Sequence, residues 1–217
     1  MTLFGGALLY LSLAGVAAGF LSLLWRRHRR KGLFLLGLGF LGFITGVYLP
    51  VSETRVTVPR TRLDEFAPVF QFSEFHSISV SASRERVDAA IRKVTPEEIR
   101  HFQTLMRIRF LSTPERRPIL ESFTAGAFQL LADEPGREIV FGRGGGARPI
   151  KIVMNFRIEE AGPGRCLLTT EARVYAVGFH ALHGFATYWR MIYPGSSLIR
   201  REWLRAIKLR AETGVPN

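Results

Sequence analysis

Two long apolar stretches separated by a short basic loop occupy the first 50 residues, and they limit the possible folds more than any other feature. The first runs from Leu3 to Trp25 without a charged residue, and the second from Leu33 to Leu49, where Pro50 ends it. A helix of about 23 residues is roughly 34 Å long, enough to cross a bilayer core of about 30 Å. The second stretch lies at the short end of the spanning range. We therefore predict a transmembrane helical hairpin over residues 1–50.

A cleavable signal peptide is the main alternative for the first stretch. It is disfavoured because the first two residues carry no basic side chain and the apolar run is longer than in an ordinary signal peptide. Both stretches also contain two small residues four positions apart, Gly15 and Gly19 in the first and Gly42 and Gly46 in the second. This spacing lets two helices approach closely in lipid, which favours a packed hairpin.

The loop between the stretches supplies five of the chain's positive charges: Arg26, Arg27, Arg29, Arg30 and Lys31. It is too short to fold around DNA and lies where the lipid headgroups are. We therefore interpret it as a topogenic signal that contacts the lipid bilayer, and expect no nucleic-acid partner. Such loops stay in the cytoplasm, although Arg55, Arg60 and Arg62 reduce the charge asymmetry. Only four of the 30 basic residues are lysines. A low share of lysine is typical of proteins encoded by GC-rich bacterial genomes. The pattern predicts a bacterial inner-membrane protein with a periplasmic C-terminal domain.

The remainder of the chain divides into a linker, a globular domain and a short tail. Residues 51–73 contain two prolines and no sustained periodicity, which predicts a juxtamembrane linker in which TRVTV could pair as a strand. We expect one domain over residues 74–212 and a tail over residues 213–217. The single cysteine, Cys166, excludes an internal disulfide and any multi-cysteine metal site.

The domain begins with a strand and two short helices. In FHSISVSA the alternate residues from His76 to Ala82 share one face, and serines share the other, which predicts a half-buried strand. Two short helices follow, and Thr95 and Glu98 form a capping box at the start of the second, with Pro96 in its first turn.

Four strand-like segments come next, separated by turns rich in glycine: AGAFQLLADE, REIVFGR, IKIVMNFRIEE and RCLLTTEARVYAV. Their spacing predicts an antiparallel meander. In the third segment Met154 and Phe156 lie on an apolar face, while Val153 is the exception on a polar face that we expect to be solvated. Glu171 and Arg173 would form an exposed charge ladder. One face of the fourth segment has mostly small side chains, which leave room for a helix or a ligand.

The chain ends with a helical pattern that we expect to break at Pro194 and Gly195, with Ser196 or Ser197 capping a restart. The restarted helix is amphipathic and basic. Its arginines, which include Arg200, Arg201 and Arg205, would attract anionic lipid headgroups.

This order of elements resembles the SRPBCC or START-like superfamily over about residues 73–211, and is closest to bacterial SRPBCC proteins. The resemblance rests on LLADEPGREIVFG and on the tail TEARVYAVGFHALHGFATYWRMIYPGSSLIRREWLRAIKLRAE. It implies an α+β helix-grip fold, a curved antiparallel sheet around a long C-terminal helix, with an apolar cavity for lipids, sterols or polyketides. The preceding transmembrane helices are a departure from a soluble carrier.

Five residues are our candidates for lining such a cavity: His76, Met154, Phe156, Tyr188 and Trp189. We expect no metal and no cofactor, because His180 and His183 lack a third ligand nearby and zinc sites need three or four. GRGGGARP lacks the lysine and serine or threonine of a phosphate-binding P-loop, so it is better explained as a hairpin turn. No catalytic constellation stands out.

We therefore predict a membrane-anchored domain that binds a hydrophobic small molecule, such as a lipid, between its sheet and its C-terminal helix. A cyclase-like or aromatase-like enzyme is the first alternative, and it would require two polar groups in the cavity. A structural or protein-interaction module with a filled cavity is the second. Sequence leaves the protein partner of such a module unknown.

Overall fold

The computed structural model describes residues 2–110, 117–126 and 128–214, so most of the expected tail lies outside the described residues. The chain divides into two compact units. The hairpin unit contains the residues up to Ser52 together with Val177–Pro194. The sheet unit contains Glu53–Ala176 and the residues from Gly195 onward. The last helix, α7 (Phe179–Thr213), therefore contributes to both units.

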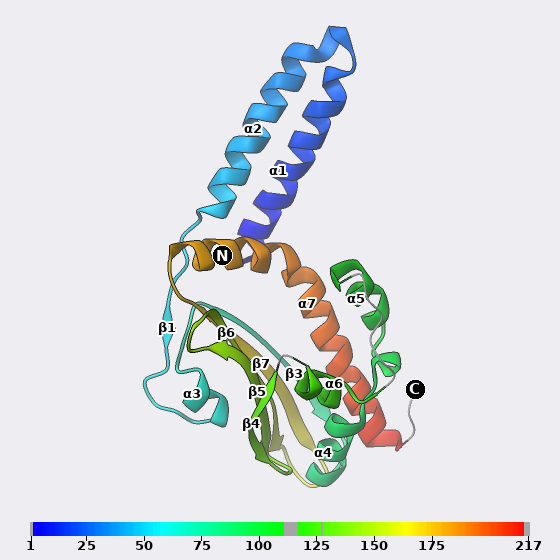
Figure 1. The fold of residues 1–217 in the computed structure, drawn as a ribbon. Helices are drawn as coiled ribbons and strands as arrows, with labels where there is room; N and C mark the ends of the chain where they lie inside the picture. Colours follow the sequence, from blue (N-terminus) through cyan, green and yellow to red (C-terminus); the bar gives the residue numbers. More distant parts are fainter. Residues whose placement is uncertain (1, 111–116, 127, 215–217) are drawn as a thin grey trace. The chain divides into compact units, whose positions relative to one another are not determined.

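The hairpin unit is built on two apolar helices, α1 (Thr2–Leu23) and α2 (Arg29–Val47), joined through a short 3-10 turn, η1 (Arg26–His28). Both helices have the length and hydropathy of a membrane span. Arg29, Arg30 and Lys31, which we expected in the loop, form the first turn of α2. The two-helix arrangement expected from the sequence is confirmed (Figure 1).

Small residues at intervals of seven form the seam between α1 and α2. The seam residues are Gly5, Ser12 and Gly19 on α1 and Gly32, Gly39 and Gly46 on α2, and all six are buried. A Cβ atom added to Gly39 would lie 2.8 Å from the Ser12 carbonyl oxygen, and one added to Gly32 would lie 2.9 Å from the Gly19 carbonyl oxygen. The backbones therefore pass too close for any larger side chain at these positions.

The first part of α7 completes the hairpin unit. The Arg190 guanidinium donates hydrogen bonds to the carbonyl oxygens of Gly46 at 2.8 Å and Leu49 at 3.0 Å. These carbonyls lie at the end of α2, where the helix itself offers no donors. Burial lowers the pKa of Arg190. In the same unit the rings of Tyr48 and Phe179 stack with centroids 6.0 Å apart.

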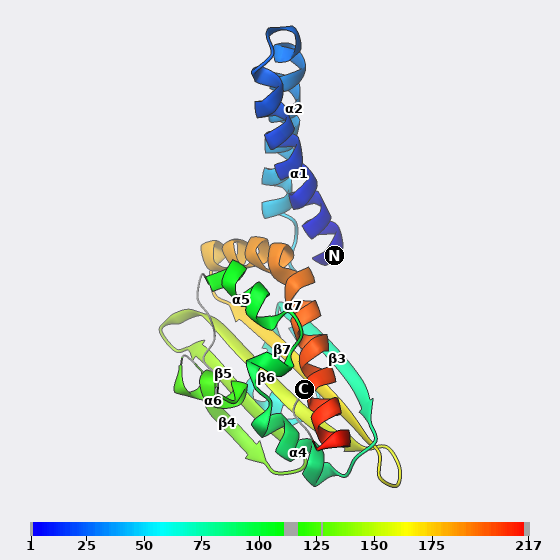
Figure 2. The ribbon, with the colours of Figure 1, turned by 90° about the vertical axis from the view of Figure 1, so that its right-hand side faces the viewer.

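The sheet unit contains five antiparallel strands in the order β3-β7-β6-β5-β4. Their bounds are β3 (Phe72–Val80), β4 (Gln129–Glu134), β5 (Glu138–Gly145), β6 (Arg148–Glu160) and β7 (Cys166–Ala176). The segments between β3 and β4 form α4 (Arg84–Lys93), the 3-10 turn η2 (Pro96–Glu98), α5 (Phe102–Phe110) and α6 (Ile119–Ala125). The second part of α7 packs on one face of the sheet, here called the inner face (Figures 1 and 2). The α+β class and the antiparallel meander are therefore confirmed.

Local chemistry explains several of these elements. The capping box at η2 is present, with the Glu98 carboxylate accepting from the Thr95 backbone amide at 2.8 Å. The end of β5 and the turn that follows it contain Gly144, Gly145 and Gly146, all with positive φ. A Cβ atom on Gly144 would lie 1.9 Å from the Ile150 carbonyl oxygen, so this turn requires glycine.

The inner face carries the main hydrophobic core. Phe156 and Met154 of β6 are buried there, and the Phe156 ring meets Trp203 of α7 edge to face with centroids 4.9 Å apart. Phe123 of α6 stacks on Trp203 at 5.7 Å. Ala172 of β7 lies beside Met154 in register, and its small side chain allows α7 to approach the sheet.

The opposite face, here called the outer face, is covered as well, so the expectation that it is solvated was wrong there. Residues 51–73, expected as a linker, contain β1 (Thr54–Arg55), α3 (Arg62–Phe66) and β2 (Val69–Phe70). A second hydrophobic cluster joins Leu63 of α3 to Val140 and Val153, which explains why Val153 broke the alternation of β6. Figure 1 shows α3 and α7 on opposite sides of the sheet.

Buried charges accompany this cluster. The Arg173 guanidinium donates to Asp64 of α3 at 2.7 Å and to Glu171 at 2.7 Å, and Arg173 is buried. The exposed charge ladder expected for Glu171 and Arg173 is therefore wrong, because α3 covers this part of β7. The Asn155 amide donates to the Glu138 carboxylate at 2.7 Å on the same face.

One expectation for the C-terminal helix was wrong, and a second, the attraction of its arginines for headgroups, remains a prediction. Helical structure continues through Pro194, so Ser196 and Ser197 lie inside α7 and cap no restart. The cations of its second part are largely paired with carboxylates: Arg200 with Glu74, Arg205 with Glu202, and Arg210 with Glu98. These pairs leave less charge to attract anionic headgroups than composition indicated.

Candidate functional site

The structure places the five predicted cavity residues in two different units. Met154 and Phe156 are buried in the inner-face core, and His76 of β3 lies on the same face, half-buried. Tyr188 and Trp189 belong to the hairpin unit, where the Trp189 ring stacks on Phe185 with centroids 5.9 Å apart. The sheet unit therefore brings three of the five residues onto one face, and the prediction for the other two remains a prediction.

His76 belongs to a polar cluster between β3 and α7, which we call the Glu74 cluster. It comprises Glu74, His76, Thr170, Ser196, Ser197 and Arg200. The period of β3 directs Glu74 and His76 to the inner face, because side chains two positions apart share a face. Ser196, Ser197 and Arg200 are on consecutive turns of α7, so its helical period presents them together.

The Glu74 carboxylate is the centre of this cluster, and its side chain is completely shielded from solvent (0% exposed). The Ser196 hydroxyl donates to its Oε2 at 2.8 Å, and the Arg200 Nε lies 3.3 Å from the same oxygen. The other oxygen, Oε1, lies 2.9 Å from Nε2 of His76. A buried carboxylate is stable only when charges and donors surround it, and Arg200 supplies the compensating charge.

The cluster does not have the geometry of a nucleophilic triad. In a Ser-His-acid triad the acid holds one ring nitrogen of the histidine and the nucleophile contacts the other. Here Nε2 of His76 faces both Glu74, at 2.9 Å, and the Ser197 hydroxyl, at 3.5 Å. The arrangement is instead suited to hydrogen bonding a polar group beside an apolar surface.

Sequence reasoning found His76 but missed Glu74, although the same two-residue period places both on the inner face. Ser196 and Ser197 were predicted as helix caps, and Arg200 was predicted to attract lipid headgroups. Only contact between β3 and α7, which are more than 100 residues apart in sequence, reveals that these side chains act together.

Neither a protein-family model nor a curated protein sequence matches this chain. Solved structures resemble it at low identity. A protein from Deinococcus radiodurans is 17% identical, with 66% of this chain and 100% of that one covered and a TM-score of 0.36. The Zhui aromatase/cyclase from a Streptomyces species is 10% identical over 67% and 99% of the two chains, with a TM-score of 0.37. The Aha1 protein of Colwellia psychrerythraea is 14% identical over 66% and 98%, with a TM-score of 0.33.

Proposed function

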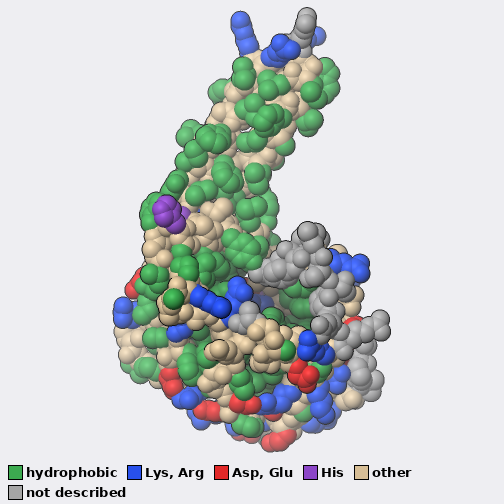
Figure 3. All heavy atoms as spheres, in the orientation of Figure 1, with side chains coloured by type: hydrophobic (Ala, Val, Ile, Leu, Met, Phe, Trp, Pro, Cys, Tyr) green, Lys and Arg blue, Asp and Glu red, His purple; other side chains and the backbone are tan. Residues whose placement is uncertain are grey.

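We propose that this protein is a membrane-anchored domain that binds a hydrophobic ligand, such as a lipid, against the inner face of its sheet. The observation that carries the proposal is the surface of the hairpin, where large apolar side chains point outward. Leu11, Phe34 and Phe4 are 72%, 70% and 67% exposed. Figure 3 shows hydrophobic side chains along the hairpin and Lys and Arg side chains at its turn. Such a surface is stable in lipid and unfavourable in water.

The inner face supports the second half of the proposal. It combines a buried apolar core around Met154 and Phe156 with the Glu74 cluster, whose buried donors and acceptors suit the polar end of an amphipathic molecule. The His76 side chain is 14% exposed, whereas the Glu74 side chain is completely shielded. A ligand would therefore contact His76 and not Glu74. We assign His76, Met154 and Phe156 to ligand contact. Anchoring would keep this face at a membrane that holds the ligand at high local concentration.

A second candidate function is favoured by one specific observation. Phe123, Phe156 and Trp203 pack on one another, and side chains from α7 and the sheet fill this part of the inner face. A filled interior would suit a protein-interaction module. The enzyme alternative has less support, because His76 contacts Glu74 and Ser197 through one nitrogen.

Native mass spectrometry of the full-length protein, released from a mild detergent, tests the proposal. We expect one lipid to remain bound after the detergent is removed, and an intact mass that includes the N-terminal helices. The variant Ala172→Phe, which fills space between β7 and α7, should lose the lipid, whereas Ala147→Phe in the exposed β5–β6 turn should retain it. A folded wild-type protein that is empty in repeated preparations would favour the interaction module, and a mass lacking the first helix would favour the signal peptide.

A further inference from the structure

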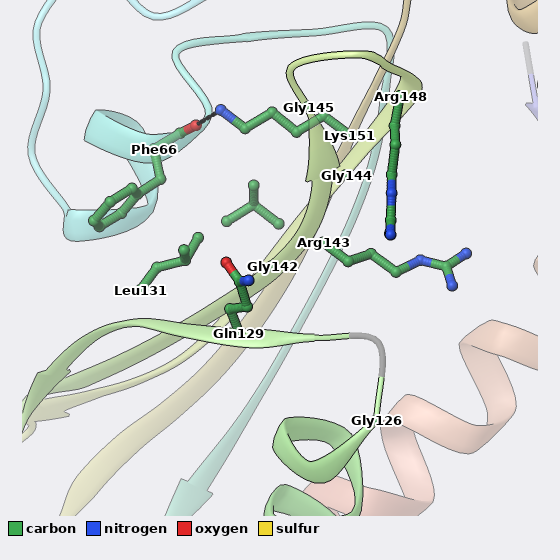
Figure 4. A pocket seen from close by; sticks show the side chains of 11 residues that line it. Phe66, Gly126, Gln129, Leu131, Gly142, Arg143, Gly144, Gly145, Arg148 and Lys151 are labelled. Carbon is green, nitrogen blue, oxygen red and sulfur yellow. Dashed lines mark hydrogen bonds between the residues drawn. The ribbon is translucent and has the colours of Figure 1, made fainter.

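The outer face of the sheet unit contains a pocket that the proposed ligand site does not use. It has a volume of about 520 Å³ and lies between α3 and strands β4, β5 and β6 (Figure 4). Its lining includes Phe66 of α3, Leu131 of β4 and Val153 of β6. Pockets that bind small molecules have volumes of roughly 300–1,000 Å³, so this one is large enough for a small ligand.

The absence of a side chain in β5, the middle one of the three strands that line the pocket, creates its floor. Gly142 of β5 is in register with Gln129 of β4 and Val153 of β6, so the three positions form a row across the sheet. A Cβ atom added to Gly142 would lie 2.8 Å from a Leu131 methyl and 3.4 Å from a Val153 methyl. The glycine therefore leaves open a space that any other residue would fill in part.

The pocket is basic, and its cations form no ion pair with any carboxylate that the structure describes. Arg143, Arg148 and Lys151 line it together with the backbone of glycine residues, and no acidic residue is in the lining. In the described part of the chain none of these three cations forms an ion pair. By contrast, Arg62 and Arg173 on the same face each contact two carboxylates.

Lys151 is held in place over the pocket by the protein backbone. Its ammonium donates to the carbonyl oxygen of Phe66 at 2.6 Å, the dashed contact in Figure 4. A lysine ammonium has three donors, so this contact leaves two for another acceptor. Figure 4 also shows the Gln129 amide directed toward the space beside Gly142, which adds a neutral polar group to the apolar side of the pocket.

We propose that this pocket binds a small amphipathic anion, with a phosphate or carboxylate on Lys151 and the apolar body against Phe66, Leu131 and Val153. An anionic group would neutralise the Lys151 ammonium, which forms no ion pair with any described carboxylate. The apolar lining selects against an inorganic anion. Gln129 orients the ligand by a hydrogen bond, because its amide is directed toward the space beside Gly142.

Calorimetric titration of the full-length protein in phosphatidylcholine nanodiscs tests this site, with hexyl phosphate as the probe. We expect saturable binding that is at least tenfold tighter than that of inorganic phosphate or hexyltrimethylammonium, with empty nanodiscs subtracted. Lys151→Met should weaken hexyl phosphate binding at least tenfold. Lys208→Met is the matched control, because Lys208 also donates to a backbone carbonyl, that of Ser79 at 2.7 Å, and should change the affinity less than twofold.

Methyl resonances of Leu131 and Val153 provide a readout that needs no variant. They should shift on addition of hexyl phosphate, while those of the inner-face residue Leu204 stay in place. Equal binding of the phosphate and the ammonium probes, or shifts confined to Leu204, would overturn the proposal. Inorganic phosphate that binds as tightly as hexyl phosphate would overturn the amphipathic assignment.

Discussion

At the scale of single residues, the sheet unit pairs three of its buried carboxylates with arginines from distant parts of the chain. Glu74 meets Arg200, Glu98 meets Arg210, and Asp64 meets Arg173. Each pair joins elements that are far apart in sequence and so fixes how strands and helices pack. The chain is strongly basic, yet much of its arginine serves this internal role.

Removing the charge of Glu74 should strongly destabilise the sheet unit. Glu74→Gln leaves the Arg200 cation beside a neutral amide in a shielded site, and losing one partner of a buried pair costs about 3–5 kcal/mol. We expect that loss in the free energy of unfolding measured with urea. Glu159→Gln is the control: Glu159 pairs with Arg157 at 2.8 Å but is exposed, so its loss should cost about 1 kcal/mol or less. Equal losses would contradict a structural role for the Glu74 cluster.

Acid should destabilise the sheet unit through Asp64. Burial by itself would raise the pKa of Asp64, but hydrogen bonds from the Arg60 backbone amide and the Arg173 guanidinium outweigh it, so the pKa lies below its usual value. The pKa of Glu98 is lowered in the same way by Arg210 and Thr95, which outweigh burial. A carboxyl group whose folded pKa is depressed contributes stability above its unfolded pKa, about 3.9 for aspartate, and that stability is lost as pH falls through the folded value.

Urea unfolding at pH 7 and at successively lower pH values, down to and below the ordinary aspartate pKa, measures this contribution. The midpoint should fall with pH, and Asp64→Asn should reduce the fall. The exposed variant Glu121→Gln should keep the wild-type pH dependence. An Asp64→Asn protein with an unchanged pH profile would show that Asp64 is not the group responsible.

Periodicity alone placed Met154, Phe156 and His76 on the inner face, because a strand has only two faces. It could not reveal what covers the other face, since the partner of Arg173 is Asp64, 109 residues earlier in the chain. The apolar Val153 was a sign of this cover in the sequence, although we expected its face to be solvated. An apolar side chain on an otherwise polar face needs a partner, and α3 provides it.

At the scale of elements, the hairpin depends on the spacing of its small residues. Two four-residue glycine spacings predicted a packed hairpin, whereas the observed seam follows a seven-residue repeat on both helices. A seven-residue repeat keeps one stripe of a helix against its partner along its whole length. The repeat was present in the sequence, but glycine is so common in membrane helices that it gave a weak signal.

Gly39→Val should disrupt the hairpin, because its side chain would enter the backbone of α1 at Ser12 and Val16. Overpacking of this kind costs about 1–3 kcal/mol. Gly37→Val is the matched control two residues earlier, where no atom lies within 4 Å of an added Cβ. An SDS titration in mixed micelles, followed by energy transfer between labels on α1 and α2, should show an earlier transition for Gly39→Val only. Identical transitions for both variants would rule out the seam.

The helix α7 was predicted least well from the sequence, because we expected it to break at Pro194. A proline removes one helical hydrogen bond and usually ends or bends a helix. In α7 both flanks of Pro194 are held by contacts: the Tyr10 hydroxyl donates to the Met191 carbonyl, and Ser196 and Arg200 engage Glu74. Tertiary contacts therefore sustain helical structure that local sequence disfavours, and the boundary between the two units falls inside the helix, after Pro194.

At the scale of the whole molecule, the basic residues of the hairpin turn should set the orientation of the chain. If Arg27, Arg29, Arg30 and Lys31 stay in the cytoplasm, the C-terminus would lie in the periplasm. Alkaline phosphatase fused to the C-terminus should then be active. A fluorescent protein fused at the same position should not fluoresce. Replacing these four residues and Arg26 with alanine should reduce phosphatase activity, whereas replacing Arg55 and Arg60 should not. Undiminished activity of the first variant would exclude a topogenic role.

In the proposed function, lipid contacts the inner face of the sheet unit as well as the hairpin. A clickable, photoreactive fatty acid fed to cells that express the full-length protein, followed by peptide mapping, tests this most directly. We expect adducts on two regions, the hairpin helices and the β6 peptide that contains Met154 and Phe156. The adducts on the β6 peptide should be lost in Ala172→Phe. Adducts confined to the hairpin would contradict the proposed function, because the domain would then be anchored in the membrane without binding a lipid.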